Sequence, residues 1–246
     1  MRAEPPTLST DAVALDAVAH LVQHARGGLG GTGSPELEAR FGSVRDDGAF
    51  VPGVSARFFA DSVAACEAWG GWSDVSAWVA STDFCYPLGD AFARTTRTGG
   101  GTLASVTHLA KRPVARCQLR LEHDGAADAP RGVRVSLAAE TPLHADDLPP
   151  SVTPTIVRDK RRKSFAWGAW RWDFTRVREG ANRAALEQGA AAERYEIEVE
   201  LAAFAEYAAS KPDDAHVATS LLMKLCDLIE AQAVGVRRDS APARRA

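Results

Sequence analysis

Three glutamates stand at every second position of residues 194–201, which read RYEIEVEL. A β-strand repeats every two residues, so Glu196, Glu198 and Glu200 share one face of such a strand, opposite an apolar face. Carboxylates with this spacing suit a hard divalent cation, which prefers oxygen ligands. The alternative is a solvated sheet edge, where neighbouring like charges face water. The rest of the chain has to decide between the two interpretations.

The same two-residue period recurs in segments at 35–41, 111–122, 132–140 and 170–177. Their polar faces carry, in chain order, Glu36, Glu38 and Arg40; Arg112, Arg116, Gln118, Arg120 and Glu122; Arg134, Ser136 and Glu140; and Arg171, Asp173 and Thr175. Turn signals such as HDGAADAPRG and REGANRA separate several of these runs. The pattern predicts a mainly antiparallel β protein.

Three segments with helical spacing of apolar residues are available to cover the sheet. One begins after a cap at Ser9 or Thr10 and ends at the Gly27 and Gly28 pair, and the others span about 55–69 and 213–233. If the sheet closes into a barrel with its apolar side outward under these helices, its polar faces converge on a lumen.

Such a lumen would hold both glutamates and arginines, and this mixture has a chemical meaning. Carboxylates bind a divalent cation, while arginine and lysine bind the oxygens of a polyphosphate. One metal with a basic cradle is the equipment for phosphoryl transfer. An ion-pair lattice that only fills the barrel is the alternative, although buried pairs repay their desolvation poorly.

The composition sets wider limits on the function. The chain has 246 residues, 46% of them hydrophobic and 25% charged, as in a globular protein with a sizeable core. No apolar run approaches the roughly 18 residues that span a bilayer, so we expect no membrane partner and a reducing intracellular location. The four cysteines show no paired spacing and are expected to be free thiols. A net charge of −3 argues against a coat on long nucleic acid, but it allows a local basic pocket.

Six motifs carry a family resemblance: ELEARFG at 36–42, KRPVA at 111–115, VSLAAETP at 135–142, RDKRRKSF at 158–165, WRWDFTRV at 170–177 and YEIEVEL at 195–201. In this order they resemble the strands of the metal-dependent mRNA 5′-triphosphatases of fungi, protozoa and large DNA viruses. This capping-enzyme beta-subunit type belongs to the triphosphate tunnel metalloenzymes. Arg40 before Phe41 and Gly42 favours the RNA enzymes over the superfamily branches that typically carry Glu-x-Glu-x-Lys.

The resemblance implies a mainly β (α+β) fold, a closed eight-stranded antiparallel tunnel with a polar lumen, covered by flanking helices. The implied domains are an N-terminal helix and glycine-rich hinge at 1–34, the tunnel with its C-terminal helix at 35–236, and a basic disordered tail at 237–246. The implied reaction removes the γ-phosphate of nascent mRNA as the first step of cap formation.

By position, the resemblance also implies roles for individual residues. The metal ligands would be Glu36, Glu38 and Glu200. Glu198 and Asp173 would hold waters bound to the metal, and Glu196 would support the groups around them. Glu140 would orient the attacking water. The phosphate-binding residues would be Lys160, Arg162 and Arg94, with Lys111 and Arg158 as further basic lining. Arg97 could replace Arg94 by a three-residue slip, and Asp83 resembles a family aspartate.

The resemblance implies Mg²⁺ or Mn²⁺ as cofactor, in-line hydrolysis with one metal, and a side activity on free NTPs. Its partners would be the 5′-triphosphate end of RNA and a separate guanylyltransferase chain, and the helices outside the tunnel would also permit a homodimer. The location would be the nucleus for a cellular protein, or the viral factory or virion for a viral one. The alternatives are an inorganic triphosphatase of the same fold and a non-catalytic scaffold subunit that binds RNA ends or polyphosphate.

Overall fold

The structure, a computed structural model, describes residues 12–28, 33–99, 105–121, 128–148, 153–188, 191–210 and 213–239. The predicted helix cap at Ser9 or Thr10, much of the glycine-rich hinge and residues 240–246 of the predicted tail lie outside the described residues.

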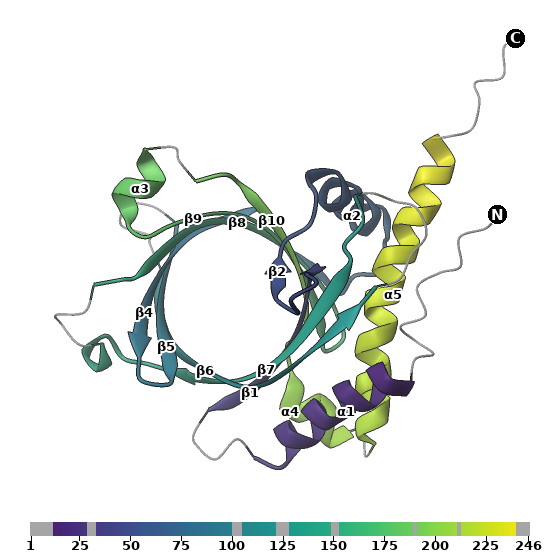
Figure 1. Cartoon of the computed structure of the whole chain (residues 1–246), viewed down its shortest axis with the longest axis horizontal. Helices are drawn as coiled ribbons and strands as arrows, with labels where there is room; N and C mark the ends of the chain where they lie inside the picture. Colours follow the sequence, from purple (N-terminus) through teal and green to yellow (C-terminus); the bar gives the residue numbers. More distant parts are fainter. Residues whose placement is uncertain are drawn as a thin grey trace, which may run out of the picture.

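Within these residues, eight long strands close into an antiparallel barrel, as predicted (Figure 1). They are β1 (Ser34–Val44), β4 (Val79–Leu88), β5 (Ala91–Thr98), β6 (Ser105–Arg120), β7 (Gly132–Pro142), β8 (Ile156–Trp167), β9 (Trp170–Gly180) and β10 (Arg194–Leu201). The order around the barrel is β1, β7, β6, β5, β4, β8, β9 and β10, and β10 pairs with β1 to close it. Two short strands, β2 (Phe50–Pro52) and β3 (Asp74–Val75), pair with β1 and β8.

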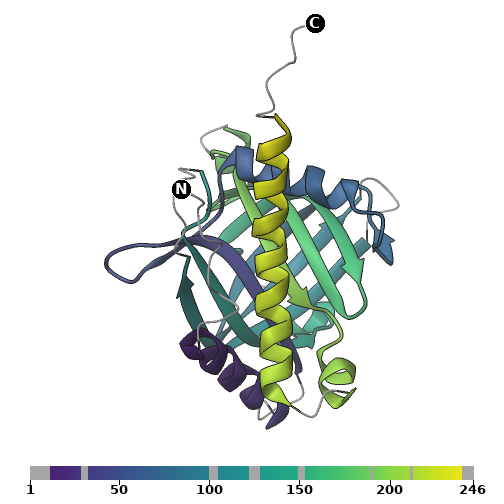
Figure 2. The ribbon, with the colours of Figure 1, turned by 90° about the vertical axis from the view of Figure 1, so that its right-hand side faces the viewer.

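Helices cover one side of this barrel. They are α1 (Ala12–Arg26), α2 (Ala56–Ala68), α4 (Phe204–Ser210) and α5 (Asp214–Asp239), while α3 (Arg183–Glu187) lies apart from them, against β8 and β9 (Figure 1). Helix α5 runs along the outside of the barrel and packs on α1, α2 and β10 (Figure 2). Helix α2 begins at the predicted N-cap, Ser55, which accepts a hydrogen bond from the backbone of Phe58. Helix α5 continues past the predicted end at 233, to Asp239.

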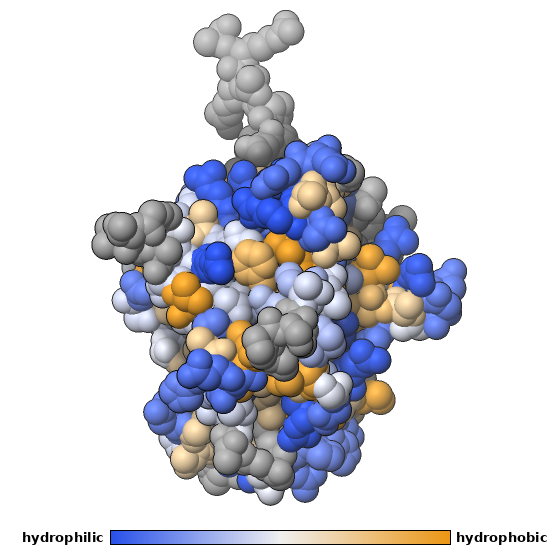
Figure 3. Space-filling view, turned by 90° about the vertical axis from the view of Figure 1, so that its left-hand side faces the viewer, coloured by the Kyte–Doolittle hydropathy of each residue, from blue (hydrophilic) through white to orange (hydrophobic). Residues whose placement is uncertain are grey.

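The hydrophobic core lies between the helices and the outer face of the barrel, so the apolar faces point outward as predicted. Leu37 and Phe41 of β1 and Ile197 and Val199 of β10 are fully buried there. Val18, Val22, Val217, Leu221 and Leu225 come from the covering helices α1 and α5. On the wall that Figure 3 shows, hydrophobic side chains are scattered among hydrophilic ones.

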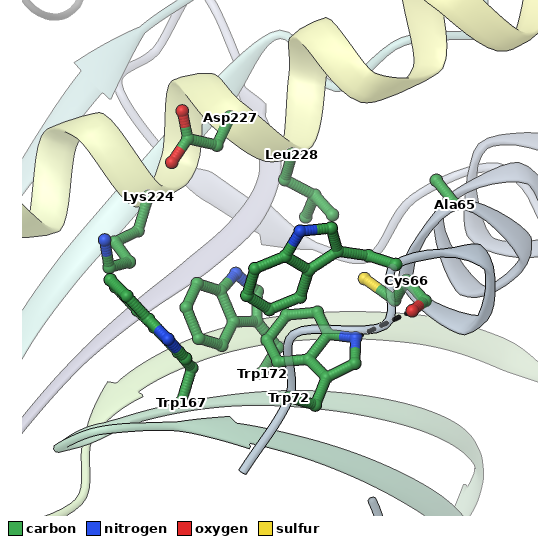
Figure 4. A pocket seen from close by; sticks show the side chains of 9 residues that line it. Ala65, Cys66, Trp72, Trp167, Trp172, Lys224, Asp227 and Leu228 are labelled. Atoms are coloured by element: carbon green, nitrogen blue, oxygen red, sulfur yellow. Dashed lines mark hydrogen bonds between the residues drawn. The ribbon is translucent and has the colours of Figure 1, made fainter.

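The tryptophans at the end of the β8–β9 hairpin pack against the helices. Trp172 contacts Trp72 with ring centroids 5.0 Å apart, and Trp170 contacts Tyr207 of α4 at 5.7 Å. Between this hairpin, α2 and α5 lies a cavity of about 410 Å³ lined largely by Trp69, Trp72, Trp167 and Trp172 (Figure 4). It lies on the helix-covered outer side of the barrel and is separate from the lumen.

One predicted alternation is wrong, and a β-bulge is the reason. The polar face predicted for 111–122 placed Arg112 with Arg116, but β6 has an irregularity between Pro113 and Ala115. Lys111 pairs with Glu140 before it, and Arg116 pairs with Ser136 after it. The extra residue therefore moves Arg112 to the opposite face and brings Lys111 onto the same face as Arg116.

The cysteines in the described residues are free thiols, as predicted. No helix within the described residues has the length and apolar character needed to cross a membrane.

A substitution at Phe174 tests whether the hydrophobic core lies on the outer face of the barrel. Its side chain is fully buried between the rings of Phe59 and Phe165, at centroid distances of 5.9 and 5.6 Å. Phe174→Ala should lower the free energy of unfolding by about 3–5 kcal/mol in urea denaturation followed by circular dichroism. Val106→Ala, at an outer position that is 48% exposed, should cost about 1 kcal/mol at most. Equal costs for the two variants would contradict this placement of the core.

Candidate active site

The charged side chains predicted as site residues lie on the inner face of the barrel. Several of their contacts join strands that have another strand between them: Lys111 of β6 reaches Glu36 of β1, and Arg158 of β8 reaches Glu196 of β10. On a curved sheet, side chains from alternate strands approach each other only on the concave face, because they diverge on the convex one. The closed barrel therefore brings the predicted residues together in one lumen.

The three predicted metal ligands meet where the barrel closes. Glu36 and Glu38 are two residues apart on β1, and Glu38 is the direct partner of Glu200 on β10. Lys111 forms ion pairs with Glu36 and, at 3.6 Å, with Glu38. Arg171 donates a hydrogen bond of 2.5 Å to Glu200. Each acidic side chain in this group thus has a basic neighbour.

These basic neighbours do not fully offset the cost of burying the acids. Burial raises the pKa of Glu36 and of Glu38, against the opposing effects of Lys111 and Arg40. The pKa of Glu200 is raised to about 7, chiefly by burial, and Glu36, Asp173 and Glu38 add to this effect. Glu36 contributes to the raised pKa of both Glu38 and Glu200, so the three carboxylates form a site where another cation would be stabilised.

The carboxylate donors fit the divalent cation that the resemblance implies. Hard cations such as Mg²⁺ and Mn²⁺ take carboxylate oxygens as ligands. Among the described residues, however, no three His, Cys, Asp or Glu side chains already have the arrangement of a metal site. In the structure, Lys111 and Arg171 hold Glu36, Glu38 and Glu200 through ion pairs.

Buried acidic side chains form ion pairs with the predicted arginines and lysine of β8. Arg162 pairs with Asp173 at 2.7 Å and with Glu198 at 3.1 Å. Lys160 pairs with Asp83 on β4 at 2.5 Å, and Asp83 is 1% exposed. Burial and the nearby Arg162 lower the pKa of Lys160, although Asp83 opposes them.

Arg158 is held in the same manner. It donates hydrogen bonds of 2.8 and 2.9 Å to the two carboxylate oxygens of Glu196, which also accepts a bond from Arg194. Arg158 lowers the pKa of Glu196 against the effect of burial. In this structure, Asp173, Glu196 and Glu198 therefore position arginines.

The remaining predicted residues, Arg94 and Glu140, face each other across β6. Arg94 Nη2 lies 3.9 Å from Glu140 Oε1, and Lys111 Nζ lies 3.8 Å from the same oxygen. Both distances are too long for a hydrogen bond, and this buried oxygen accepts no hydrogen bond from any residue that the structure describes. Glu140 therefore presents an unsatisfied acceptor to the lumen.

The choice between Arg94 and Arg97 follows from the alternation of β5. Arg94 faces the lumen, whereas Arg97 lies three residues on and stacks over Phe84 on the outer face, 5.2 Å from the ring centroid. Only Arg94 of this pair can contribute to a site in the lumen.

Arg40 and Arg171 are among the lumen residues that were absent from the predicted site. Arg40 forms an ion pair with Glu198, and Arg171 pairs with Glu200 and Asp173. Both share the polar face of a predicted strand, so the alternation places them in the lumen. Their partners come from neighbouring strands and depend on the register, which the sequence pattern does not specify.

Comparison with known proteins gives the fold and the site a context. The family model for the mRNA capping enzyme beta chain matches residues 126–232. None of the curated proteins matches the sequence significantly. The solved structures similar to this chain include the Pct1 RNA triphosphatase of S. pombe, with a TM-score of 0.64 and 15% identity over 89% of this chain and 92% of that one.

The Mimivirus capping enzyme triphosphatase is also similar, with a TM-score of 0.61 and 13% identity over 90% of this chain and 99% of that one. A further structure holds Pct1 in complex with the Spt5 CTD, and matches with a TM-score of 0.63 and 14% identity over 89% of this chain and 92% of that one. The shared tunnel fold and the family match confirm the predicted resemblance to the RNA triphosphatases of mRNA capping.

The ion pair between Lys160 and Asp83 can be tested directly. Lys160→Met leaves a buried carboxylate without its cation, which should lower the free energy of unfolding by about 3 kcal/mol or more. Lys163→Met on the same strand breaks an ion pair with Glu67, which is 48% exposed, and should cost under about 1 kcal/mol.

Urea denaturation of both variants gives the comparison. Adding Asp83→Asn to Lys160→Met should recover part of the lost stability, because the unpaired charge is removed. If Lys160→Met lowers the free energy of unfolding no more than Lys163→Met does, the buried ion pair between Lys160 and Asp83 is contradicted.

Proposed function

We propose that this chain is an RNA 5′-triphosphatase that removes the γ-phosphate from the 5′ end of nascent mRNA. One observation carries the proposal: acids and bases from six separate sequence motifs meet in one closed lumen, in the fold of RNA triphosphatases. A triphosphate needs cations along its whole length, and this lumen supplies them from β5, β6 and β8.

The metal would be Mg²⁺ or Mn²⁺, held by Glu36, Glu38 and Glu200. When bound, it would neutralise charge on the phosphate oxygens and help to fix the orientation of the triphosphate. Lys111 and Arg171, which hold these carboxylates in the structure, would then be available to phosphate oxygens. Glu198, Asp173 and Glu196 keep their role of positioning the arginines.

The chain's own residues account for the other requirements of hydrolysis. Lys160, Arg162 and Arg94 bind the oxygens of the γ-phosphate, with Lys111 and Arg158 along the chain of phosphates. Glu140 Oε1, the unsatisfied acceptor, accepts a hydrogen bond from the attacking water and aligns it with the γ-phosphorus. The new bond joins the water oxygen to this phosphorus, and the bond to the bridging oxygen breaks in line. The products are phosphate and RNA with a 5′-diphosphate end.

Partners and location follow from this activity. A diphosphate end is the substrate for guanylyl transfer, so we propose that a separate guanylyltransferase chain acts next. A homodimer and hydrolysis of free NTPs with manganese are further parts of the proposal. It places the chain in the nucleus if cellular, or in the viral factory or virion if viral.

Release of phosphate from γ-labelled triphosphate-ended RNA tests the reaction. The wild-type chain should release only the γ-phosphate, and only with Mg²⁺ or Mn²⁺. Glu200→Ala should lower kcat about 100-fold or more, since a lost metal ligand removes several kcal/mol of transition-state stabilisation. Glu187→Gln on α3, far from the lumen contacts and paired with Arg183 at the surface, serves as the control.

Three results would each contradict the proposed function. Release from tripolyphosphate without release from RNA would point to an inorganic triphosphatase. No release from either substrate would leave a binding scaffold. Equal activity of Glu200→Ala and the wild type would remove the acidic strand from the mechanism.

Metal binding can be measured without a substrate. Mn²⁺ that binds only the folded chain should raise the melting temperature by about 5 °C at a concentration 100 times its Kd. Glu36→Gln combined with Glu38→Gln should abolish the rise, and EDTA should reverse it in the wild type. The same rise in both proteins would show that the ion binds elsewhere.

A further inference from the structure

Three arginines gather towards the end of the lumen nearest β2: Arg40 and Arg134 lie one step beyond Glu38, and Arg116 lies at the level of Glu38. Arg40 of β1 is the direct partner of Arg134 on β7. Arg116 on β6 pairs with Ser136, the partner of Glu38, so it lies on the same inner face. Burial lowers the pKa of Arg134, and the nearby Arg40 and Arg116 lower it further. Like charges therefore accumulate at this end.

An aromatic ring lies beside these arginines. The guanidinium carbon of Arg134 is 4.7 Å from the centroid of the Phe50 ring. Gly42 alternates with Glu38 and Arg40, so a β-carbon there would point into the lumen, where it would lie 2.6 Å from the Phe50 ring. Glycine at this position thus permits Phe50 of β2 to lie on the lumen side of β1, where Figure 1 draws β2 within the outline of the ring.

Among the described residues, two of the three arginines form no ion pair with an acid. Arg40 pairs with Glu198, whereas Arg134 and Arg116 pair with no acid in this part of the chain. The buried Nε of Arg134 has no hydrogen-bond partner within the described ranges. By contrast, Lys111, Arg158, Lys160, Arg162 and Arg171 all have acidic partners. The surplus positive charge is therefore localised at the β2 end.

We propose that this end of the lumen is a nucleotide subsite for the RNA chain that follows the 5′-triphosphate. Arg134 and Arg116 bind a phosphodiester, and Phe50 stacks against a nucleobase. Arginine binds phosphate oxygens in a planar, bidentate manner, and an aromatic ring accepts the face of any base. This inference rests on the proposed function, and it assigns the preference for RNA over inorganic triphosphate to these residues.

The position along the strand agrees with this assignment. Arg40 and Arg134 lie one two-residue step beyond the level of Glu38, which is about 7 Å along β1. The triphosphate would occupy the section between Glu36, Glu38 and the basic wall. The next charged groups of the substrate would then reach the arginines at the β2 end.

Steady-state kinetics on two substrates tests the subsite. The substrates are a triphosphate-ended oligoribonucleotide and inorganic tripolyphosphate, each measured with Mn²⁺. For Arg134→Gln, the ratio of kcat/KM for RNA to kcat/KM for tripolyphosphate should fall about tenfold or more, since a charge-assisted phosphate contact is lost. For Phe50→Leu the ratio should fall about fivefold, from lost stacking.

The chain offers a matched control on its outer face. Arg97 stacks over Phe84 as Arg134 stacks over Phe50, but outside the lumen. Arg97→Gln should leave the ratio unchanged, and melting temperatures show that each variant is folded. A ratio within twofold of the wild type for Arg134→Gln would overturn the subsite.

A binding measurement separates failure of the subsite from failure of the proposed function. Fluorescence anisotropy with a 5′-hydroxyl oligoribonucleotide needs no hydrolysis. Arg134→Gln should weaken this binding about tenfold, while Arg97→Gln should not. If the wild type releases no phosphate from RNA, the proposed function fails, and this binding result still decides the subsite: a tenfold loss supports it, and equal binding overturns it.

Discussion

The cost of holding charge away from bulk water governs this structure. Asp83, Asp173, Glu196 and Glu198 are all buried inside the barrel, and each would be strongly destabilising without a cation. Closure of the sheet solves this problem, because the concave face brings together side chains from alternate strands, such as Arg162 and Glu198. The same closure forces the apolar faces outward, where helices must cover them.

A lumen organised in this way is prepared for a charged ligand. In the structure, most of the bases in the lumen pair with acids, such as Arg162 with Asp173 and Lys160 with Asp83. The cost of burying the acids is shown by the pKa values of Glu36, Glu38 and Glu200, which burial raises. A metal ion bound to a triphosphate carries both signs of charge. The acids could therefore exchange a basic side chain for the metal, and the bases could exchange a carboxylate for a phosphate. Few side chains would have to move for this exchange, because Asp173 and Glu198 already fix the position of Arg162 in the lumen.

Much of the fold followed from alternation alone, because side chains on a strand switch faces at every residue. The shared face of Glu36 and Glu38 on β1, and the opposed faces of β9, were predicted correctly for this reason. The bulge before Ala115 was not predicted, because alternation alone does not count an extra residue; Pro113, which lies at the irregularity, is the local signal, since proline within a sheet is found mainly at edges and bulges. The resemblance placed Lys111 in the site, whereas simple alternation would have put it on the outer face. The ion pairs of Arg40 and Arg171 depend on register between distant strands, which only the closed barrel specifies.

The two ends of the lumen differ, and this difference gives the tunnel a direction. Around Glu36, Glu38 and Glu200, burial raises the pKa of each carboxylate despite the nearby Lys111, Arg40 and Arg171, so a further positive ion would be stabilised in this section. Around Arg134 and Arg116, cations exceed acids, and Phe50 adds an aromatic surface. A linear substrate with a metal-bound triphosphate at one end and a nucleotide chain at the other matches both sections in only one orientation. The field inside the barrel would thus orient the RNA before any base is recognised.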